Sequence, residues 1–388
     1  MESIVQSFKT SKKACFVENK NVCEGEILED DEYVLKFDLT EDKNYIFCAL
    51  SNFEIGYFTL AQDGYVKFGG MMGENKHTKR INDIFINENV LYTCSNDRQC
   101  RLYDLKANKL IKAFNLNHEI YSISKSKHIL AGANESGIVF WDLRTMKQRN
   151  QFNETHNEEV TCVKFNENIP TQFVSSSLDG ILCLFDLSQQ NEEEACQAII
   201  RTDQPVDRCG YINNEIVYGI TTVDSVFIMN SQTETIMQNI NAIEYNEFNK
   251  DYLIDAYNDS NINEFKILVG KQKGYVEERI IRKVDDQIQQ QVCRVIKTEH
   301  TKQIRQIKKI DENVYITVGE EGSLQVITKT DEDLQKQMNI DILNNGQEFE
   351  SKMDEEAHQM FMDDENDEQN DQNKKKGKGG QKNNFRPF

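Results

Sequence analysis

The sequence is short of several features that mark other classes of protein. Only three of its 388 residues are proline and only one is tryptophan. It contains no apolar run approaching the roughly 18–20 residues that cross a bilayer. Its start, MESIVQSFKTSKK, lacks the apolar segment of a secretory signal peptide. We therefore expect a soluble intracellular protein, nuclear or cytoplasmic, without membrane contact.

Sequence patterns of catalytic and metal sites are also missing. There is no GxSxG, no HExxH, no phosphate-binding glycine loop and no dinucleotide fingerprint. Ten cysteines occur without a CxxC pair, mostly in apolar runs such as YIFCAL and ILCLF, where cysteine is a small buried side chain. Acidic pairs such as Glu158 and Glu159 fall in turns, where they are solvated charges. We predict a protein that is not an enzyme, with no catalytic residue, metal, cofactor or small-molecule substrate.

Positive charge is scarce relative to negative charge. The chain holds 45 basic and 65 acidic residues, a formal net charge of −20. A protein that binds nucleic acids generally needs a basic surface to displace counterions. The balance therefore disfavours general nucleic-acid binding and favours protein partners that are basic.

Short alternating apolar runs fill the first 330 residues. Examples are YVLKFDL, VLYTCS, GIVFWDL and GILCLFDL, each broken by Asn, Asp or Gly. Runs of this length with such turn residues predict β-strands, and long amphipathic helices are absent from this stretch. With few prolines to interrupt them, the runs predict an all-β fold.

The runs repeat, and the repeat is clearest at one tight turn in each unit. The strongest turns carry Asp97, Glu135, Asp179 and Glu321, as in TCSNDRQCRLYD and SSSLDGILCLFD. Weaker units place turns at Asn52, Asp224 and Lys273. Successive turns lie 38 to 49 residues apart, which predicts seven repeated units.

The units resemble WD repeats, which implies a seven-bladed WD-repeat β-propeller. In that family a His, a turn acid, a hydroxyl and an aromatic side chain form a structural tetrad in each blade. The matching positions here are the histidines His77, His118, His156 and His300, the acids already named, the hydroxyl positions Thr93, Ala131, Ser175 and Thr317, and the aromatic positions Tyr103, Trp141, Phe185 and Ile327.

No copy of the tetrad is complete. The blade with Trp141 lacks the hydroxyl, because Ala131 stands there, and the other three lack the indole. The resemblance makes these histidines structural hydrogen-bond partners of a carboxylate rather than catalytic groups. The blades with turns at Asp224 and Lys273 have no His, so we expect them to be less regular.

Two domains follow from the pattern. Residues 1–330 form the propeller, and an N-terminal strand around residues 12–19 (KKACFVEN) closes the ring, so that no sheet edge stays open. Residues 331–388 form a mostly disordered, acidic-then-basic tail. Residues 351–373 carry a net charge of −8, and residues 374–388 hold six basic groups and no acid.

A finer resemblance covers roughly residues 30–330. The segment ETHNEEVTCVKFNENIPTQFVSSSLDGILCLFDLSQQNEEEA is similar to the fourth-blade region of the WD repeat-containing protein 89 family, and so are GIVFWDLR before it and DYLIDAY…ILVGKQKG after it. The resemblance implies no activity beyond that of a propeller.

We therefore predict a scaffold or chaperone-like adaptor that binds a basic macromolecule through propeller loops and the charged tail. Residues 374–388 would serve as a nuclear address read by an import receptor or as an RNA contact, or would only keep the chain soluble. The predicted contact residues lie in loops of one face: Asn96, Arg98, Glu119, Asn134, Glu158, Glu159, Lys271 and Glu320.

One motif supports an alternative function. FWDLR, with Trp141, Asp142 and Arg144, fits the WDxR box through which some propellers dock onto the adaptor of cullin-RING ubiquitin ligases. Under this alternative the protein is a substrate receptor of such a ligase. Trp141 and Asp142 also belong to the ordinary repeat, so the specific content of the motif is mainly Arg144.

Overall fold

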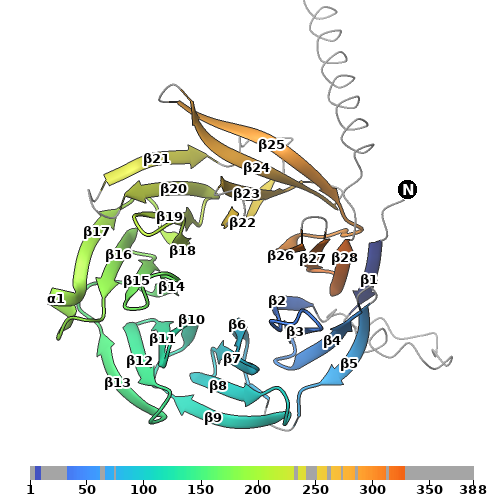
Figure 1. The fold of residues 1–388 in the computed structure, drawn as a ribbon, viewed down its shortest axis with the longest axis horizontal. Helices are drawn as coiled ribbons and strands as arrows, with labels where there is room; N and C mark the ends of the chain where they lie inside the picture. Colours follow the sequence, from blue (N-terminus) through green and yellow to red (C-terminus); the bar gives the residue numbers. More distant parts are fainter. Residues whose placement is uncertain are drawn as a thin grey trace, which may run out of the picture. The chain divides into compact units, whose positions relative to one another are not determined.

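The computed structural model contains seven four-stranded antiparallel sheets arranged as blades around one axis (Figure 1). It describes residues 5–9, 33–61, 66–73, 76–230, 235–241, 251–259, 264–271, 274–284, 287–311 and 314–327. The chain divides into two units, 1–331 and 332–388, and the second lies outside the described residues. The charged tail predicted for residues 331–388 is therefore a sequence prediction only. No described helix is long and apolar enough to span a bilayer.

The strands nearest the axis open each blade, and the second strands pair with them. The innermost strands are β2 (Val34–Leu39), β6 (Ile81–Asn87), β10 (Ile120–Ser126), β14 (Val160–Phe165), β18 (Val206–Tyr211), β22 (Tyr252–Asp259) and β26 (Ile304–Asp311). The second strands are β3 (Tyr45–Leu50), β7 (Val90–Ser95), β11 (Ile129–Asn134), β15 (Gln172–Ser177), β19 (Ile216–Thr221), β23 (Glu264–Gly270) and β27 (Val314–Gly319).

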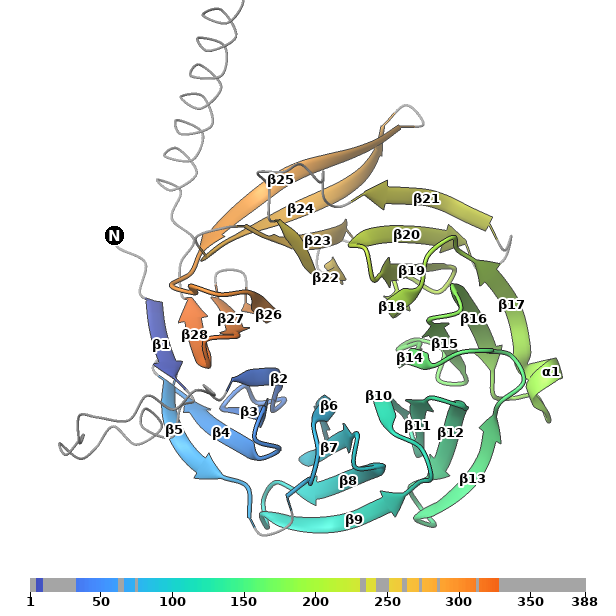
Figure 2. The same ribbon diagram turned by 180° about the vertical axis from the view of Figure 1, so that it is seen from behind.

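The third and outer strands complete each blade toward the rim of the ring (Figure 2). The third strands are β4 (Ile55–Leu60), β8 (Gln99–Asp104), β12 (Gly137–Asp142), β16 (Ile181–Asp186), β20 (Ser225–Asn230), β24 (Tyr275–Val284) and β28 (Ser323–Ile327). The outer strands are β5 (Val66–Met71), β9 (Lys109–Asn115), β13 (Lys147–Phe152), β17 (Cys196–Arg201), β21 (Thr235–Asn241), β25 (Gln287–Lys297) and β1 (Val5–Lys9). The prediction of seven blades is confirmed.

The N-terminal strand closes the ring, but not with the predicted residues. β1 pairs antiparallel with β28 and completes the seventh blade, with Val5 opposite Ile327 and Lys9 opposite Ser323. The segment 12–19 that we expected there lies outside the described residues. The earlier run VQSFK was overlooked because its alternation is weak, whereas β28 offers a full row of backbone groups to pair with it.

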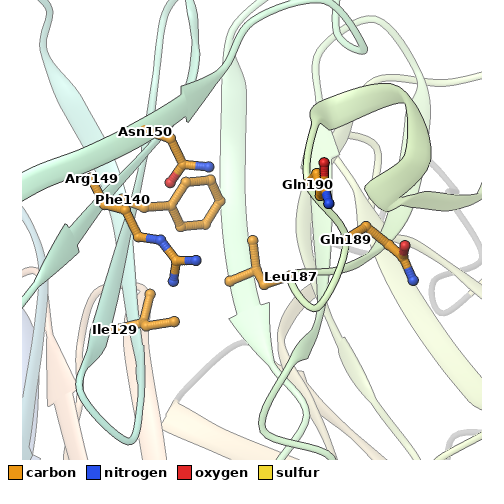
Figure 3. Close-up of a pocket in the computed structure, with 7 residues that line it drawn as sticks. All are labelled: Ile129, Phe140, Arg149, Asn150, Leu187, Gln189 and Gln190. Atoms are coloured by element: carbon orange, nitrogen blue, oxygen red, sulfur yellow. The ribbon is translucent and has the colours of Figure 1, made fainter.

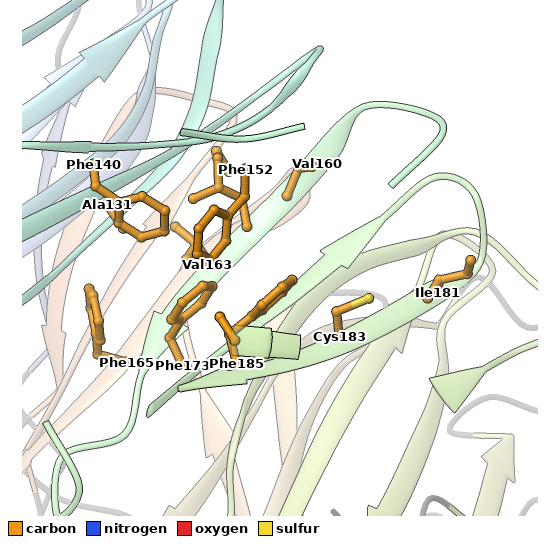
Figure 4. Close-up of a cluster of buried hydrophobic side chains, with 13 residues drawn as sticks. Ala131, Phe140, Phe152, Val160, Val163, Phe165, Phe173, Ile181, Cys183 and Phe185 are labelled. Carbon is orange, nitrogen blue, oxygen red and sulfur yellow. The ribbon is translucent and has the colours of Figure 1, made fainter. Parts of the chain in front are cut away.

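Apolar side chains gather between neighbouring blades. The buried residues form seven clusters, one at each blade interface. The cluster between blades 3 and 4 is rich in phenylalanine (Figure 4), and the rings of Phe173 and Phe185 stack with centroids 4.8 Å apart. Six of the eight described cysteines are buried free thiols, as expected of small apolar side chains. Because each interface buries its own core, the blades stabilise one another in series.

Polar contacts also join the innermost strands around the axis. Lys36 in blade 1 pairs with Asp83 in blade 2 at 3.0 Å, and Asp83 accepts from the Ser122 hydroxyl in blade 3 at 3.1 Å. The Arg208 guanidinium in blade 5 donates to the Ile254 carbonyl in blade 6 at 2.6 Å. Across the closure, the amide nitrogen of Phe37 donates to the Gln306 side chain at 2.8 Å. These bonds satisfy polar groups where backbones of adjacent blades converge.

Blade 4 carries the short helix α1 (Glu192–Ala195) before its outer strand. Asn191 caps the helix by accepting from the Glu194 amide nitrogen. The Glu192 carboxylate accepts from the backbone nitrogens of Asn153, Glu154 and Thr155 at 2.7–2.9 Å, and from the Thr155 hydroxyl at 2.5 Å. One carboxylate thereby fastens α1 to the connection between blades 3 and 4.

Candidate functional site

One face of the ring carries the eight loop residues that the sequence suggested as partner contacts. In an antiparallel blade, the turn between the second and third strands lies at the same edge as the connection that enters the blade. We call this edge the turn face. Its turns are residues 51–54, 96–98, 135–136, 178–180, 222–224 and 320–322, and in blade 6 the described residues Lys271 and Gly274 lie at this edge.

A histidine, an acid and a hydroxyl meet at the turn face in blades 2, 4 and 7. In blade 2 the His77 Nδ1 lies 2.8 Å from Asp97 Oδ2, and its Nε2 lies 2.8 Å from Thr93 Oγ1. The other two sets are His156 with Asp179 at 3.2 Å and Ser175 at 2.7 Å, and His300 with Glu321 and, at 2.8 Å, Thr317.

The electrostatics of blade 2 fit a structural role. Burial is the main influence on His77 and lowers its pKa, against the pull of the neighbouring Asp97 carboxylate. Burial is also the largest single influence on Asp97 and acts to raise its pKa, but the hydrogen bond and charge of His77, the Thr78 amide and Arg101 together lower the pKa of that acid. Asp97 further accepts from the Thr78 and Gln99 amide nitrogens at 3.1 and 3.0 Å. The set joins the entering connection to the turn and leaves no group positioned for acid–base catalysis.

The fourth tetrad position is apolar in two of these blades. Phe185 and Ile327 are buried and carry no hydrogen-bonding group. The series of side-chain hydrogen bonds therefore ends at the hydroxyl in blades 4 and 7. In blade 2 the position holds Tyr103, which is also buried. Packing replaces the indole hydrogen bond of a complete tetrad in blades 4 and 7.

Blade 3 has the tryptophan but a different histidine. Trp141 is buried and stacks on Phe114 at 5.2 Å, and a Cβ on Gly132 would lie 2.9 Å from its ring atoms. His118 contacts Glu135 at 2.5 Å, and the two side chains are 43% and 44% exposed. The corresponding histidine of blade 2 has no exposed side-chain surface. The strand register places Gly132, not the predicted Ala131, where Thr93 stands in blade 2, because the blade 3 turn is one residue shorter. Blade 3 therefore has no hydroxyl at this position for the His118 ring to bond.

Blade 5 places its turn acid one residue away from the others. Asp224 has φ +57°, the left-handed position that Gly180 and Gly322 occupy in blades 4 and 7. Asp accepts this conformation more readily than most residues. The place of the tetrad acid therefore falls to Val223, and Asp224 instead accepts from the Leu253 amide nitrogen of blade 6 at 3.2 Å. Apart from this turn, blade 5 has four strands of ordinary length.

Blade 6 has a buried polar cluster that sequence reasoning missed. The predicted turn residue Lys273 lies outside the described residues. Deeper in the blade, Glu278 on β24 is buried and accepts from the Tyr257 hydroxyl. Its carboxylate also contacts Lys266 at 3.7 Å and Cys293 at 3.4 Å. The only signal was the charged pair in YVEERIIR, which interrupts an apolar strand.

Four of the predicted contact residues are held by neighbours. The Asn134 side chain is buried, not exposed as expected, because its Oδ1 caps the following turn at Ser136. Asn96 accepts from Asn82 at 2.5 Å. The other two residues form ion pairs. Lys271 pairs with Asp251 at 2.6 Å, and Glu320 pairs with Arg305 at 2.7 Å.

The other four lie in two charged regions of the turn face. Arg98 has φ +68° at the tip of the blade 2 turn and is exposed. Glu119 pairs with Lys79 of blade 2 at 3.2 Å and keeps 28% of its side chain exposed. Glu158 and Glu159 are exposed, and their backbone carbonyls accept from the Ser177 hydroxyl and the Leu178 amide nitrogen at 3.2 and 3.1 Å.

An acidic sector therefore covers blades 3 and 4 on the turn face. We give this name to Glu119, Glu135, Glu158 and Glu159. Tyr121 lies among them at the start of β10. Partial burial and the carboxylates of Glu159, Glu135 and Glu119 raise the pKa of this tyrosine to about 12. The sector can attract a cation, and the tyrosine adds an aromatic ring beside it.

The FWDLR motif lies partly inside the blade. Trp141 is core, and Asp142 and Arg144 lie at the turn into β13, on the face opposite the turn face. The Arg144 guanidinium donates to Asp142 at 3.1 and 2.7 Å, and its side chain is 67% exposed. That ion pair lowers the pKa of Asp142. Of the three residues, Arg144 is the most accessible.

No group of three or more metal-ligating side chains occurs among the described residues. The candidate site is the charged surface of the turn face. Its position and charge come from loops that the blades hold in place.

Comparisons with known proteins agree with this architecture. A model described as "WD domain, G-beta repeat" matches residues 74–104 and 147–186. The WD repeat-containing protein 89 homolog of Dictyostelium discoideum is 29% identical over 191 residues, 49% of this chain and 52% of that protein. The WD repeat-containing protein GTS1 of Arabidopsis thaliana is 25% identical over 210 residues, 49% of this chain and 54% of that protein. Each match thus spans about half the relative.

A solved structure has the same fold. A chain in the crystal structure of the mitotic checkpoint complex superposes with a TM-score of 0.61 over 81% of this chain and 98% of its own length. The two sequences are 13% identical, so the likeness concerns the fold alone.

Proposed function

This chain is a WD-repeat β-propeller, and we propose that it is a non-enzymatic scaffold or chaperone-like adaptor for a basic macromolecular partner. WD-repeat propellers generally act as protein-interaction scaffolds. The specific proposal rests on one observation, the acidic sector around Tyr121 on the turn face. Fold alone says nothing about the partner, so the argument comes from this surface.

The acidic sector supports a basic partner in two ways. Its carboxylates attract cations over a distance of about 10 Å at 0.1 M salt, which speeds encounter with a positively charged surface. Tyr121 then offers a ring against which an Arg or Lys side chain can stack. The chain as a whole is also acidic, with a net charge of −20.

Basic residues of the neighbouring blade 2 mark the limit of the acidic sector. Lys79 and Arg80 enter blade 2, and Arg98 lies at its turn. A basic partner that covered blade 2 as well would meet these cations, so we place its contact over blades 3 and 4. In this proposal the acidic residues 351–373 add a second contact, and residues 374–388 serve as an import signal or RNA contact.

Affinity purification from cells tests the proposal. Glu158→Lys with Glu159→Lys reverses the centre of the sector, and Glu167→Lys makes the same change on the exposed opposite edge of blade 4. We expect a basic protein to be recovered with the wild type and with the control, and to be lost with the double variant. The proposal would be contradicted if the double variant recovered the partner as well as the wild type does, or if the recovered partner were not basic.

The alternative role, as a substrate receptor of a cullin-RING ligase, is supported only by the exposure of Arg144. The same purification separates the two functions. Under the alternative, Arg144→Glu abolishes recovery of a ligase adaptor while the sector variants retain it. Under the scaffold proposal, Arg144→Glu leaves the basic partner in place and no adaptor is recovered from the wild type. Deletion of residues 331–388 reports separately on the tail.

A further inference from the structure

A pocket of about 220 Å³ lies between blades 3 and 4, away from the acidic sector. Its wall is formed from both blades (Figure 3): Ile129, Phe140, Arg149 and Asn150 from blade 3, and Leu187, Gln189 and Gln190 from the segment that leads from β16 to α1. Nothing in the proposed scaffold function uses this pocket.

The apolar part of the wall is fixed by the core. Phe140 belongs to the buried cluster between the two blades, and Ile129 and Leu187 pack against that cluster while staying partly exposed. Pockets for drug-sized molecules are usually larger, at about 300–1,000 Å³. The size and lining of this pocket suit one apolar side chain.

The polar part of the wall includes the exposed side chain of Arg149. Arg149 is exposed on β13, and no hydrogen bond or ion pair joins its guanidinium to the described residues. Arg144, at the preceding turn, is instead paired with Asp142 at 2.7 Å. A free guanidinium beside an apolar wall favours a carboxylate, which it can bind through two parallel hydrogen bonds.

The neighbouring amide lacks a partner. Asn150 Oδ1 is buried and has no hydrogen bond within the described part of the chain. A buried acceptor without a donor costs free energy, and a small rotation of this amide would turn the oxygen toward an N–H donor in the pocket. Figure 3 shows the Asn150 side chain beside the Phe140 ring, and Gln190 across the space from it.

We propose that this pocket binds the carboxyl-terminal residue of a partner protein, when that residue is apolar. A terminal Leu or Phe has three groups that match the wall. Its side chain contacts Ile129 and Leu187, and its α-carboxylate pairs with Arg149. Its backbone N–H supplies the donor that Asn150 lacks. An internal residue has no α-carboxylate, and an aspartate or glutamate side chain has no apolar group for the wall.

Peptide binding measured by fluorescence anisotropy tests the assignment. The probe is a fluorescein-labelled hexapeptide, Gly-Ser-Gly-Ser-Gly-Leu, with a free carboxylate, and the reference is the same peptide as the carboxamide. We expect saturable binding of the free acid and at least about tenfold weaker binding of the amide, because a hydrogen bond to a charged group contributes that much.

Arg149→Gln should weaken binding of the free-acid peptide by about tenfold and leave binding of the carboxamide peptide unchanged. Lys147→Gln is the matched control, since Lys147 is exposed on the same strand and does not line the pocket. Equal affinity for acid and amide, no effect of Arg149→Gln, or no saturable binding would overturn the proposal. So would N-acetyl-leucine competing as well as the peptide, because the pocket would then be a site for free organic acids. The acidic sector is not involved, so the scaffold proposal can fail or succeed independently.

Discussion

Two histidines of neighbouring blades lie in different surroundings. His77 is buried between Thr93 and Asp97, whereas His118 lies at the surface with Glu135. The blades differ in spacing as well as at the hydroxyl: His77 lies four residues before Ile81, the first paired residue of β6, and His118 lies two residues before Ile120, the first of β10. A buried imidazole bonded at both nitrogens should matter far more to stability than an exposed pair.

We therefore expect His77→Asn to lower the free energy of unfolding by about 2–4 kcal/mol, because it leaves Asp97 and Thr93 without a shared partner inside the blade. His118→Asn is the matched change in blade 3, and its cost should stay within about 0.5 kcal/mol. Urea unfolding followed by fluorescence and circular dichroism measures both. Equal losses in the two variants would mean that the buried hydrogen bonds of His77 contribute no more to stability than the exposed pair of His118.

Acid should weaken blade 2 through the same pair. The folded pKa of His77 lies below its usual value of about 6.5, so below that pH the unfolded chain binds more protons than the folded one. The free energy of unfolding contributed by this residue is complete above pH 6.5 and declines as the pH falls. Asp97, whose pKa is also lowered, adds a loss of the same sign below about pH 4.

The measurement is the urea midpoint at pH 7.5 and at pH 5.0. The midpoint should fall with pH in the wild type and fall less in His77→Asn. A wild-type midpoint that rises toward pH 5 would contradict the assignment.

In blades 2, 4 and 7 the turn acid lies four residues after the hydroxyl that its histidine contacts, so a fixed spacing suffices there. In blade 3 the turn is one residue shorter, and the same spacing points to Ala131 although Gly132 holds the matching position. The sequence also suggested Asp224 as the turn acid of blade 5, but this residue occupies the left-handed position one residue after the acid position of the other blades. A backbone φ angle cannot be read from the sequence. Sequence reasoning also treated Asn134 as exposed, although its side chain folds back onto the turn. Glu278 was missed because its partners come from four different strands.

At the scale of elements, the helix α1 has one charged contact with the rest of the ring. The Glu192 carboxylate accepts from three backbone N–H groups and a hydroxyl of residues 153–155. Glu193, the next residue of the same helix, is exposed. The position of α1 thus depends on this charged acceptor together with Ala195, which is buried in the cluster between blades 3 and 4.

Glu192→Gln should free the connection between blades 3 and 4, because a neutral amide accepts these bonds more weakly. We expect the amide hydrogens of Asn153, Glu154 and Thr155 to exchange about tenfold faster or more, with a loss of about 1–2 kcal/mol in local stability. Glu193→Gln, the control, should leave exchange unchanged. Hydrogen exchange by mass spectrometry would refute the idea if both variants behaved alike.

The long hairpin of blade 6 is an element whose length the sequence pattern did not predict. The strands β24 and β25 span 10 and 11 residues, against six in most third strands, and form a hairpin that extends past the inner strands of blade 6 (Figure 1). The sequence predicted only that blades without a histidine would be less regular. In blade 6 the added length follows from cross-strand pairing, and the alternation of residues 275–297 does not reveal where pairing stops.

At the scale of the whole molecule, closure by β1 holds the ring together. Removal of residues 1–9 would leave β28 as an open edge and delete its five residue pairs with β1. Alternate pairs of an antiparallel ladder exchange two hydrogen bonds each, so at about 1 kcal/mol net per bond we expect the free energy of unfolding to fall by about 4–6 kcal/mol. The truncated protein should also self-associate, because an unpaired strand edge is a template for another chain.

Removal of residues 1–4 is the control, since it leaves β1 intact. Chemical unfolding and light scattering distinguish the two truncations. If the longer truncation were as stable and as monomeric as the shorter one, the closure would not carry the stability assigned to it.

The number of blades was predictable because turns recur along the whole chain, whereas the closing strand occurs once and has no second copy to be aligned with. Its alternation over five residues is too short to be separated from its surroundings, and the partner that selects it lies at the other end of the propeller sequence. The acidic sector was only partly visible, since Glu119, Glu158 and Glu159 come from different loops that the ring brings together.

The pairing of β1 with β28 also sets an order of events during synthesis. Val5–Lys9 leave the ribosome well before their partner Ser323–Ile327, which follows about 300 residues later. At about 5–20 residues per second, β1 waits on the order of 15–60 s before it can pair. Until the last blade is synthesised, β1 therefore has no partner strand and the ring is open. Slower translation near the last blade lengthens this interval.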